Sequence, residues 1–276
     1  MGSYDKVQFM SWELHTGPEP RRPEAEAPVY RGLPDQEHDI AARLAFAADA
    51  VARAELFSDH RASTLKIFLG PCRLFRGAGA DYAPAPEPGG GPAAPPASLR
   101  AGLRAMAVGA PYGDWVFVVG AALLGPAGLH DIALVQHRDH DLGRCSATGG
   151  ALFQMPGVAD RDGHAIDLRV VPGLGLDLQR PCTSRPISYA LYCSGLCNPD
   201  GTCGRGTRLW GGAAPLAGAP WRCVEASRDA AHVGTELVTV ASTVPTALGM
   251  VSAGRLWNQA DRQGAGKVRM IAPLTL

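Results

Sequence analysis

Two helix–strand pairs in the first half of the chain constrain its fold more than any other feature. Residues 35–56 carry apolar side chains at helical spacing and begin with Asp35, a residue type that accepts backbone hydrogen bonds at helix starts. The apolar run 65–69 follows, and a Gly-Pro step ends it, which is typical of a buried strand. A second helix is predicted over 97–109 and a second buried strand over 114–120. Strands that alternate with helices predict a layered α/β or α+β fold.

The rest of the chain predicts more strands and one long loop. Apolar segments indicate strands over residues 4–12, 131–136, 151–155, 165–171, 187–193 and 235–241. Residues 77–97 are rich in Gly, Pro and Ala and predict a flexible loop or lid. Residues 194–223, rich in Gly, Pro and Cys, are predicted to be loop. Because neither flank of 77–97 looks complete alone, we expect a single domain over 1–276.

Charge and hydropathy argue against two classes of partner. The chain has 26 basic and 26 acidic side chains, so its formal net charge is zero. Nucleic-acid and membrane-surface binding usually need a basic surplus, so we expect neither partner. No apolar run approaches the ~20 residues that span a bilayer. Residues 1–15 lack the pattern of a secretory signal, so we expect a cytoplasmic protein whose cysteines are reduced.

Four segments, taken in order, resemble one family. They are TLKIFLGPCRLFRG (64–77), DWVFVVGAALLG (114–125), HDIALVQ (130–136) and GHAIDLRVVPGLGL (163–176). In this order they resemble strands and turns around the catalytic site of the carbon–nitrogen hydrolase (nitrilase) superfamily, and the resemblance covers about 64–200. It implies an αββα sandwich, in which two mixed sheets are flanked by helices. It also implies a homodimer, because nitrilase-like proteins pair to extend the sandwich.

The three catalytic residues of that family are missing at the matching positions. Nitrilases use a Glu general base, a Lys that stabilises the tetrahedral intermediate and a Cys nucleophile. Cys72 stands where the Glu is expected, and Val158 stands where the nucleophile is expected. No lysine lies between Lys66 and Lys267, and the segment after 131–136 that would carry it is short. We therefore expect no hydrolysis of amides or nitriles.

Titratable residues beside the ancestral site are candidates for new chemistry. Cys72 would act as a nucleophile or acid, or else fill the space of the lost Glu as a small buried hydrophobe. His137 opens the run HRDHD and would transfer protons, or else belong to a solvated polar turn. Asp160 and His164, in ADRDGH, would polarise a carbonyl or move a proton, or else only shape a turn. We predict that four residues contact the substrate: Phe75, Tyr82, Val158 and Asp162.

Two groups of possible metal ligands have spacings that do not favour a metal. His137 and His140 would need a further ligand such as His130 or Cys145. The set Cys182, Cys193, Cys197 and Cys203 would offer zinc four thiolates. Structural zinc sites usually pair their ligands two to four residues apart, twice over, and only one pair here approaches that spacing. We predict no metal and no cofactor, although zinc at the four cysteines stays open.

Two functions from different classes remain. The first is a nitrilase scaffold reused in natural-product biosynthesis, acting on a carbonyl- or amide-containing small molecule by cyclisation, rearrangement or condensation. The second is a non-catalytic pseudoenzyme that keeps the fold as a binding or scaffold subunit. His and Asp are concentrated at 137–141 and 160–164, the two loops beside the ancestral site, and a pure scaffold has no reason to keep them there. This concentration favours the enzyme.

Overall fold

The computed structural model describes the helical and strand framework of the chain. The described residues are 2–13, 16, 32–71, 73–77, 81–85, 94–125, 128–146, 151–171, 175–179, 189–194, 206–211, 223–226, 235–239, 243–246, 249–252 and 267–276. No helix among them is both long enough and apolar enough to cross a membrane.

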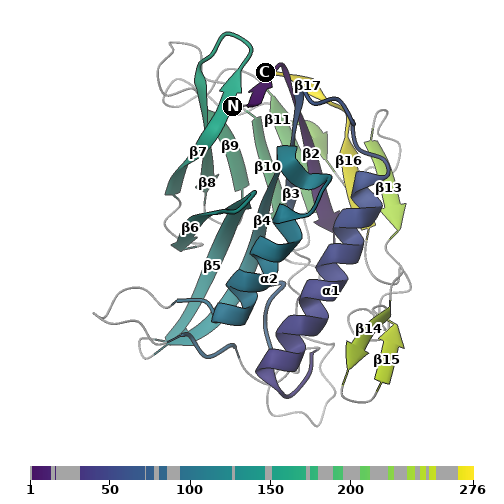
Figure 1. Cartoon of the computed structure of the whole chain (residues 1–276), viewed down its shortest axis with the longest axis vertical. Coiled ribbons are helices and arrows are strands. Elements are labelled where there is room, and N and C mark those ends of the chain that lie inside the picture. Colours follow the sequence, from purple (N-terminus) through teal and green to yellow (C-terminus); the bar gives the residue numbers. More distant parts are fainter. Residues whose placement is uncertain are drawn as a thin grey trace.

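An eight-stranded mixed sheet forms the centre of the molecule (Figure 1). Its order is β13 (Thr235–Thr239), β16 (Lys267–Ile271), β2 (Lys6–Glu13), β3 (Thr64–Leu69), β4 (Trp115–Gly125), β5 (Gly128–His137) and β6 (His140–Ser146), and β17 (Leu274–Thr275) also pairs with β2. Strands β2, β3 and β4 run parallel, while the other pairs are antiparallel. The parallel strands are joined through helices, as a parallel connection requires.

Both helices cover the same face of this sheet (Figure 1). Helix α1 (Gln36–Glu55) follows β2 and α2 (Ala97–Val108) follows β3, and a short turn of 3₁₀ helix, η1 (Tyr112–Asp114), leads into β4. As the sequence predicts, Asp35 caps α1 by accepting a hydrogen bond from the backbone N–H of His38. The layer between helices and sheet is rich in aromatic side chains, and the ring centroids of Trp12 and Phe46 lie 4.5 Å apart.

A second mixed sheet packs on the opposite face. Its seven strands are, in order, β1 (Gly2–Tyr4), β7 (Ala151–Asp160), β8 (Ala165–Val171), β9 (Gly175–Gln179), β10 (Tyr189–Ser194), β11 (Gly206–Gly211) and β12 (Cys223–Ala226). Only β1 and β7 are parallel. Buried side chains of both sheets, such as Ile67 and Val116 on one and Phe153 and Leu168 on the other, fill the space between them. A separate hairpin joins β14 (Thr243–Thr246) to β15 (Gly249–Ser252).

These observations confirm the coarse prediction of an α+β fold with two mixed sheets and two helices. They place helix, sheet and sheet in successive layers, because both described helices share one face of the eight-stranded sheet. The helical layer that would cover the other side of an αββα sandwich has no counterpart in the described part of the chain. The family arrangement therefore stays a prediction.

Two predicted loops are wrong in part. The apolar pattern breaks at His137, yet only Arg138 and Asp139 form the turn, and β6 begins at His140. This strand was missed because polar side chains at a sheet edge give no apolar alternation. Strand β11 likewise lies inside 194–223, where Gly, Pro and Cys predicted loop. The two predicted helices are confirmed. The predicted strand 4–12 is divided between β1 and β2, which belong to different sheets. The other predicted strands are confirmed where their residues are described; β4, β5 and β7 are longer than expected, and β4 and β5 pair antiparallel.

Candidate functional site

The structure separates the predicted site residues into three places. Phe75 and Tyr82 belong to the core under the helices. His137 ends β5 and faces the space between the two sheets. Asp160 ends β7, next to the turn that leads to β8. Cys72 lies outside the described residues, so its predicted role is not addressed.

Phe75 and Tyr82 are 0% and 1% exposed, respectively, and sit in the segment that follows β3. This segment runs beside β4, where the backbone N–H of Phe75 donates to Gly120 (3.1 Å) and that of Tyr82 donates to Ala122 (3.1 Å). Tyr82 pairs with Leu123 on β4, whereas His137 pairs with Val116. Seven residues of strand span about 23 Å. The predicted substrate contacts Phe75 and Tyr82 are therefore far from His137.

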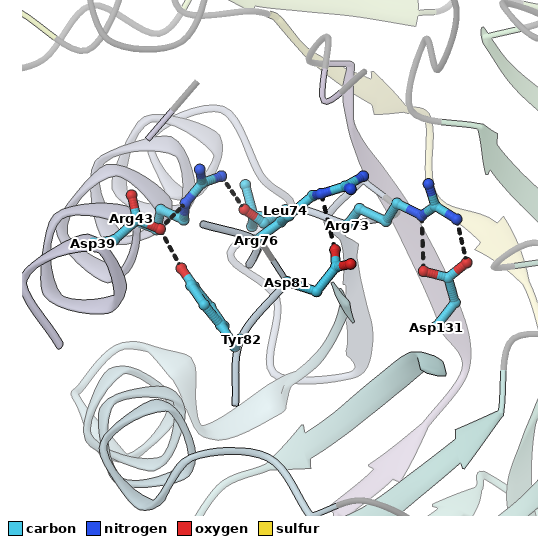
Figure 2. Close-up of polar contacts among 8 residues, drawn as sticks. All are labelled: Asp39, Arg43, Arg73, Leu74, Arg76, Asp81, Tyr82 and Asp131. Carbon is cyan, nitrogen blue, oxygen red and sulfur yellow. Dashed lines mark hydrogen bonds and ion pairs between the residues drawn. The ribbon is translucent and has the colours of Figure 1, made fainter. Parts of the chain in front are cut away.

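Tyr82 belongs to a buried polar network on α1 (Figure 2). The hydroxyl of Tyr82 and the Nε of Arg43 (2.7 Å) both donate to Oδ2 of Asp39. The other oxygen of Asp39 accepts from the backbone N–H of Leu33 (2.7 Å), and Arg43 donates to the carbonyl of Leu74. Burial, the largest cause, raises the pKa of Tyr82, so its hydroxyl is a neutral donor. Each Asp39 oxygen has a partner, which indicates a structural tie between α1 and the segment after β3.

Two more ion pairs hold the same segment (Figure 2). Arg73 donates to both carboxylate oxygens of Asp131 on β5, at 2.8 and 2.6 Å. Arg73 has a φ of +53°, in the left-handed region that a non-glycine residue rarely adopts. The Nε of Arg76 lies 2.9 Å from Oδ1 of Asp81. One ion pair thus ties the segment after β3 to β5, and the other links two residues within the segment.

His137 is a buried histidine to which no described residue hydrogen-bonds. Its side chain is 0% exposed, and neither ring nitrogen has a partner among the described residues. Burial is the main reason that the pKa of His137 falls from 6.5 to about 4, and the charges of Arg138 and His140 lower it further. At neutral pH the ring is uncharged, which suits a buried position but leaves two polar atoms unsatisfied.

Asp114, just before β4, links this end of the sheet to the other sheet. Its Oδ1 accepts a hydrogen bond from the hydroxyl of Tyr4 on β1 at 2.8 Å, and Nη2 of Arg138 lies 4.0 Å from the same oxygen. Burial and the neighbouring Asp114 raise the pKa of Tyr4, so Tyr4 stays protonated and donates. Sequence reasoning missed this contact, since 110 residues separate the two partners and neither has a local motif.

Asp160, Asp162 and His164 do come together, in the turn between β7 and β8. One oxygen of Asp160 accepts from the backbone N–H groups of Asp162 and His164, each at 2.9 Å. The other lies 3.2 Å from Nδ1 of His164. Asp160 is 1% exposed, whereas 43% of the His164 side chain is exposed. Val158, two residues earlier on β7, is buried between the sheets.

The same turn offers the one group of three potential metal ligands found in the described part of the chain. Ligand atoms of Asp160, Asp162 and His164 lie within 4.8 Å of one another. The oxygens of Asp160, however, already bind two backbone N–H groups and the ring of His164. A cation would have to displace the imidazole from Asp160 or share the carboxylate with it. The arrangement suits an oriented histidine better than a metal.

No family model, curated protein or solved structure matches the chain. The resemblance to nitrilases therefore rests on the four segments and the missing triad described above. The roles predicted for individual residues likewise stay predictions, and the geometry of the site is the basis for the function proposed next.

Proposed function

We propose that the protein is an enzyme in which Asp160 and His164 form an acid–base dyad. One observation carries this proposal: a buried carboxylate holds an exposed imidazole through a single ring nitrogen. When Nδ1 carries the proton and donates it to Asp160, the lone pair of Nε2 is free for a substrate. Asp160 then stabilises the imidazolium that forms when Nε2 takes a proton.

The proposed substrate is a small molecule that contains a carbonyl or amide group. His164 would remove a proton from the carbon beside the carbonyl and return it later to another atom. Such a proton transfer serves cyclisation, rearrangement or condensation and needs no covalent enzyme intermediate. Val158 occupies the position expected for the nitrilase nucleophile, which is why the proposed reaction is not hydrolytic. Reactions of this kind are frequent in natural-product biosynthesis, the setting we propose.

The proposed architecture is a nitrilase-like αββα sandwich that pairs as a homodimer. The order β2–α1–β3–α2–β4, with three parallel strands and a second sheet stacked behind, supports it. In this architecture the segment after β3 borders the ancestral site. The dyad lies at the end of β7, in a loop that the resemblance also places beside the ancestral site.

Deuterium exchange tests the dyad without knowledge of the natural substrate. A panel of small ketones, β-ketoamides and aldehydes is incubated with the protein in D₂O, and incorporation beside the carbonyl is followed by NMR. The wild-type protein is expected to accelerate exchange in at least one compound. His164→Gln and Asp160→Asn are expected to lower that rate by about 100-fold or more, the range typical of a lost general base.

His140 provides the matched control, since its Nε2 lies 3.5 Å from Asp139 but both side chains are more than half exposed. His140→Gln is expected to keep the wild-type exchange rate. Circular dichroism of each variant separates loss of the dyad from loss of the fold. The proposal is wrong if no compound exchanges faster with the wild type than with His164→Gln.

A specific observation favours a second candidate, a non-catalytic pseudoenzyme that serves as a binding or scaffold subunit. Phe75 and Tyr82, which were predicted to contact the substrate, are buried in the hydrophobic core. The hydroxyl of Tyr82 donates to Asp39, which is a structural contact. In the proposed nitrilase-like architecture, the side chains of Phe75 and Tyr82 would occupy space that a substrate needs. Equal exchange rates for the wild type and both dyad variants would support this candidate over the enzyme.

A further inference from the structure

His137 occupies an unusual position for a titratable side chain. It lies directly opposite Val116 on β4, which is itself opposite Ile67 on β3. Paired residues of a sheet share a face, and both neighbours belong to the core between the sheets, so His137 points into that core. There it is fully buried, and no described residue hydrogen-bonds to either ring nitrogen.

The charged groups that act on this ring come from two places. Arg138, Asp139 and His140 belong to its own hairpin, and Asp114 precedes β4, two residues from Val116. Arg138 and His140 oppose a positive charge on the ring, while Asp114 and Asp139 favour it. Asp139 is largely exposed to solvent. Asp114, at 30% exposure, is the less exposed of the two carboxylates and is therefore the better partner for a charged His137.

Asp114 already has a structural role at neutral pH. It accepts the hydroxyl of Tyr4, which reaches it from the other sheet. Tyr4 belongs to the edge strand β1, which pairs with β7 through only three residues, from Gly2 opposite Val158 to Tyr4 opposite Asp160. So short a strand gains little from its ladder. Two side chains also hold it: Ser3 donates to the carbonyl of Asp160 (3.0 Å), and the buried Tyr4 is the one that reaches Asp114.

We propose that His137, Asp114 and Tyr4 form an acid-sensitive latch that holds β1 on the sandwich at neutral pH and releases it when His137 binds a proton. A buried imidazolium needs a carboxylate partner. Asp114 turns toward it and gives up the hydroxyl of Tyr4. That hydroxyl is then buried without an acceptor, which destabilises the position of β1.

The direction of the pH effect follows from the two states of His137. The unfolded chain binds the proton with a pKa near 6.5, and the folded chain binds it with a pKa of about 4. Protonation therefore favours the unfolded or opened state. The stabilising effect is complete above pH 6.5 and is lost as the pH falls toward 4. From this group alone, the equilibrium constant for unfolding should rise about 100-fold between pH 7 and pH 4.

Two measurements test the latch. The NMR titration of the His137 ring should give a midpoint near pH 4 in the folded protein, and urea unfolding at pH 7, 5.5 and 4 gives the equilibrium constants. The apolar variant His137→Leu should lose the 100-fold component. His130→Gln, on the same strand but opposite Leu123, should retain it. Because His137→Leu could itself misfold, His137→Gln, which is uncharged at every pH, serves as a second variant.

The release of β1 has its own readout. Hydrogen exchange at the backbone amides of residues 2–4 should become faster as His137 is protonated. Tyr4→Phe should give fast exchange already at pH 7, with no further acid dependence beyond that of the bulk amides. A His137 midpoint near pH 6.5, or the same acid-induced loss of stability in wild type and both His137 variants, would overturn the proposal. So would β1 amides that stay protected below pH 4 while the rest of the fold persists.

Discussion

Two buried polar positions on opposite faces of the eight-stranded sheet differ in their hydrogen bonding. On the helix side, Asp39, Arg43 and Tyr82 satisfy one another and the nearby backbone. On the side facing the second sheet, His137 is equally buried but has no hydrogen-bond partner among the described residues. A satisfied network fixes one geometry, whereas an unsatisfied titratable group leaves the structure sensitive to its surroundings. The first pattern indicates a structural role, and the second indicates a group whose protonation can change the structure.

The turn after β7 combines parts of both patterns. Asp160 is as buried as Asp39 and fully engaged, but its histidine partner reaches solvent. In the Asp39 network both charged partners are inaccessible, so no substrate can share them. This difference in exposure, rather than the residue types, is the reason that the dyad is proposed as a site and the network is not.

Removing the charge of Arg43 should produce the largest loss. Arg43→Met leaves the carboxylate of Asp39 buried with Tyr82 and one backbone N–H as its partners among the described residues. Breaking a buried pair from one side costs about 3–5 kcal/mol, and urea unfolding at pH 7 measures it. The triple variant Asp39→Leu, Arg43→Met, Tyr82→Phe removes the whole network and should recover most of that loss. A loss below about 1 kcal/mol for Arg43→Met would contradict the structural role of the network.

Tyr82→Phe should have an intermediate effect. It deletes one hydrogen bond to a charged carboxylate and keeps the ring in the core, for an expected loss of about 1.5–3 kcal/mol. Tyr112 is the matched control, because its ring packs against Trp115 and Phe117 and no described residue hydrogen-bonds to its hydroxyl. Tyr112→Phe should change the free energy of unfolding by less than about 0.5 kcal/mol. Equal losses for the two variants would remove the distinction between them.

Much of the helix side could be predicted from the sequence, since its signals are local. The Asp35 cap, the helical spacing after it and the run 65–69 each describe neighbouring residues. Asp39 and Arg43 could also have been found, because they are four residues apart on α1 at positions that belong to its buried face. A charged pair at such positions indicates a buried ion pair rather than a solvated surface.

The space between the sheets could not be predicted in this way. The contact of Tyr4 with Asp114 depends on how two sheets stack, and strand order is set by long-range pairing that periodicity does not encode. The polar neighbours of His137 in the sequence suggested a turn at the surface. Only the pairing with Val116 shows that it faces the core. Asp160 and His164 were found together because their contact spans four residues of one turn.

The smallest effect is expected at the pair of Arg73 and Asp131, which lies at the rim of the helix side. Both side chains are about one-third exposed, so water and salt screen their attraction despite its two hydrogen bonds. Asp131→Asn should cost about 0.5–1 kcal/mol at low salt, and the loss should shrink in 1 M NaCl. Asp139→Asn, at a more exposed contact with His140, should cost less still. If Asp131→Asn instead lowered the free energy of unfolding as much as Arg43→Met does, at every salt concentration, burial would not explain the difference between the two ion pairs.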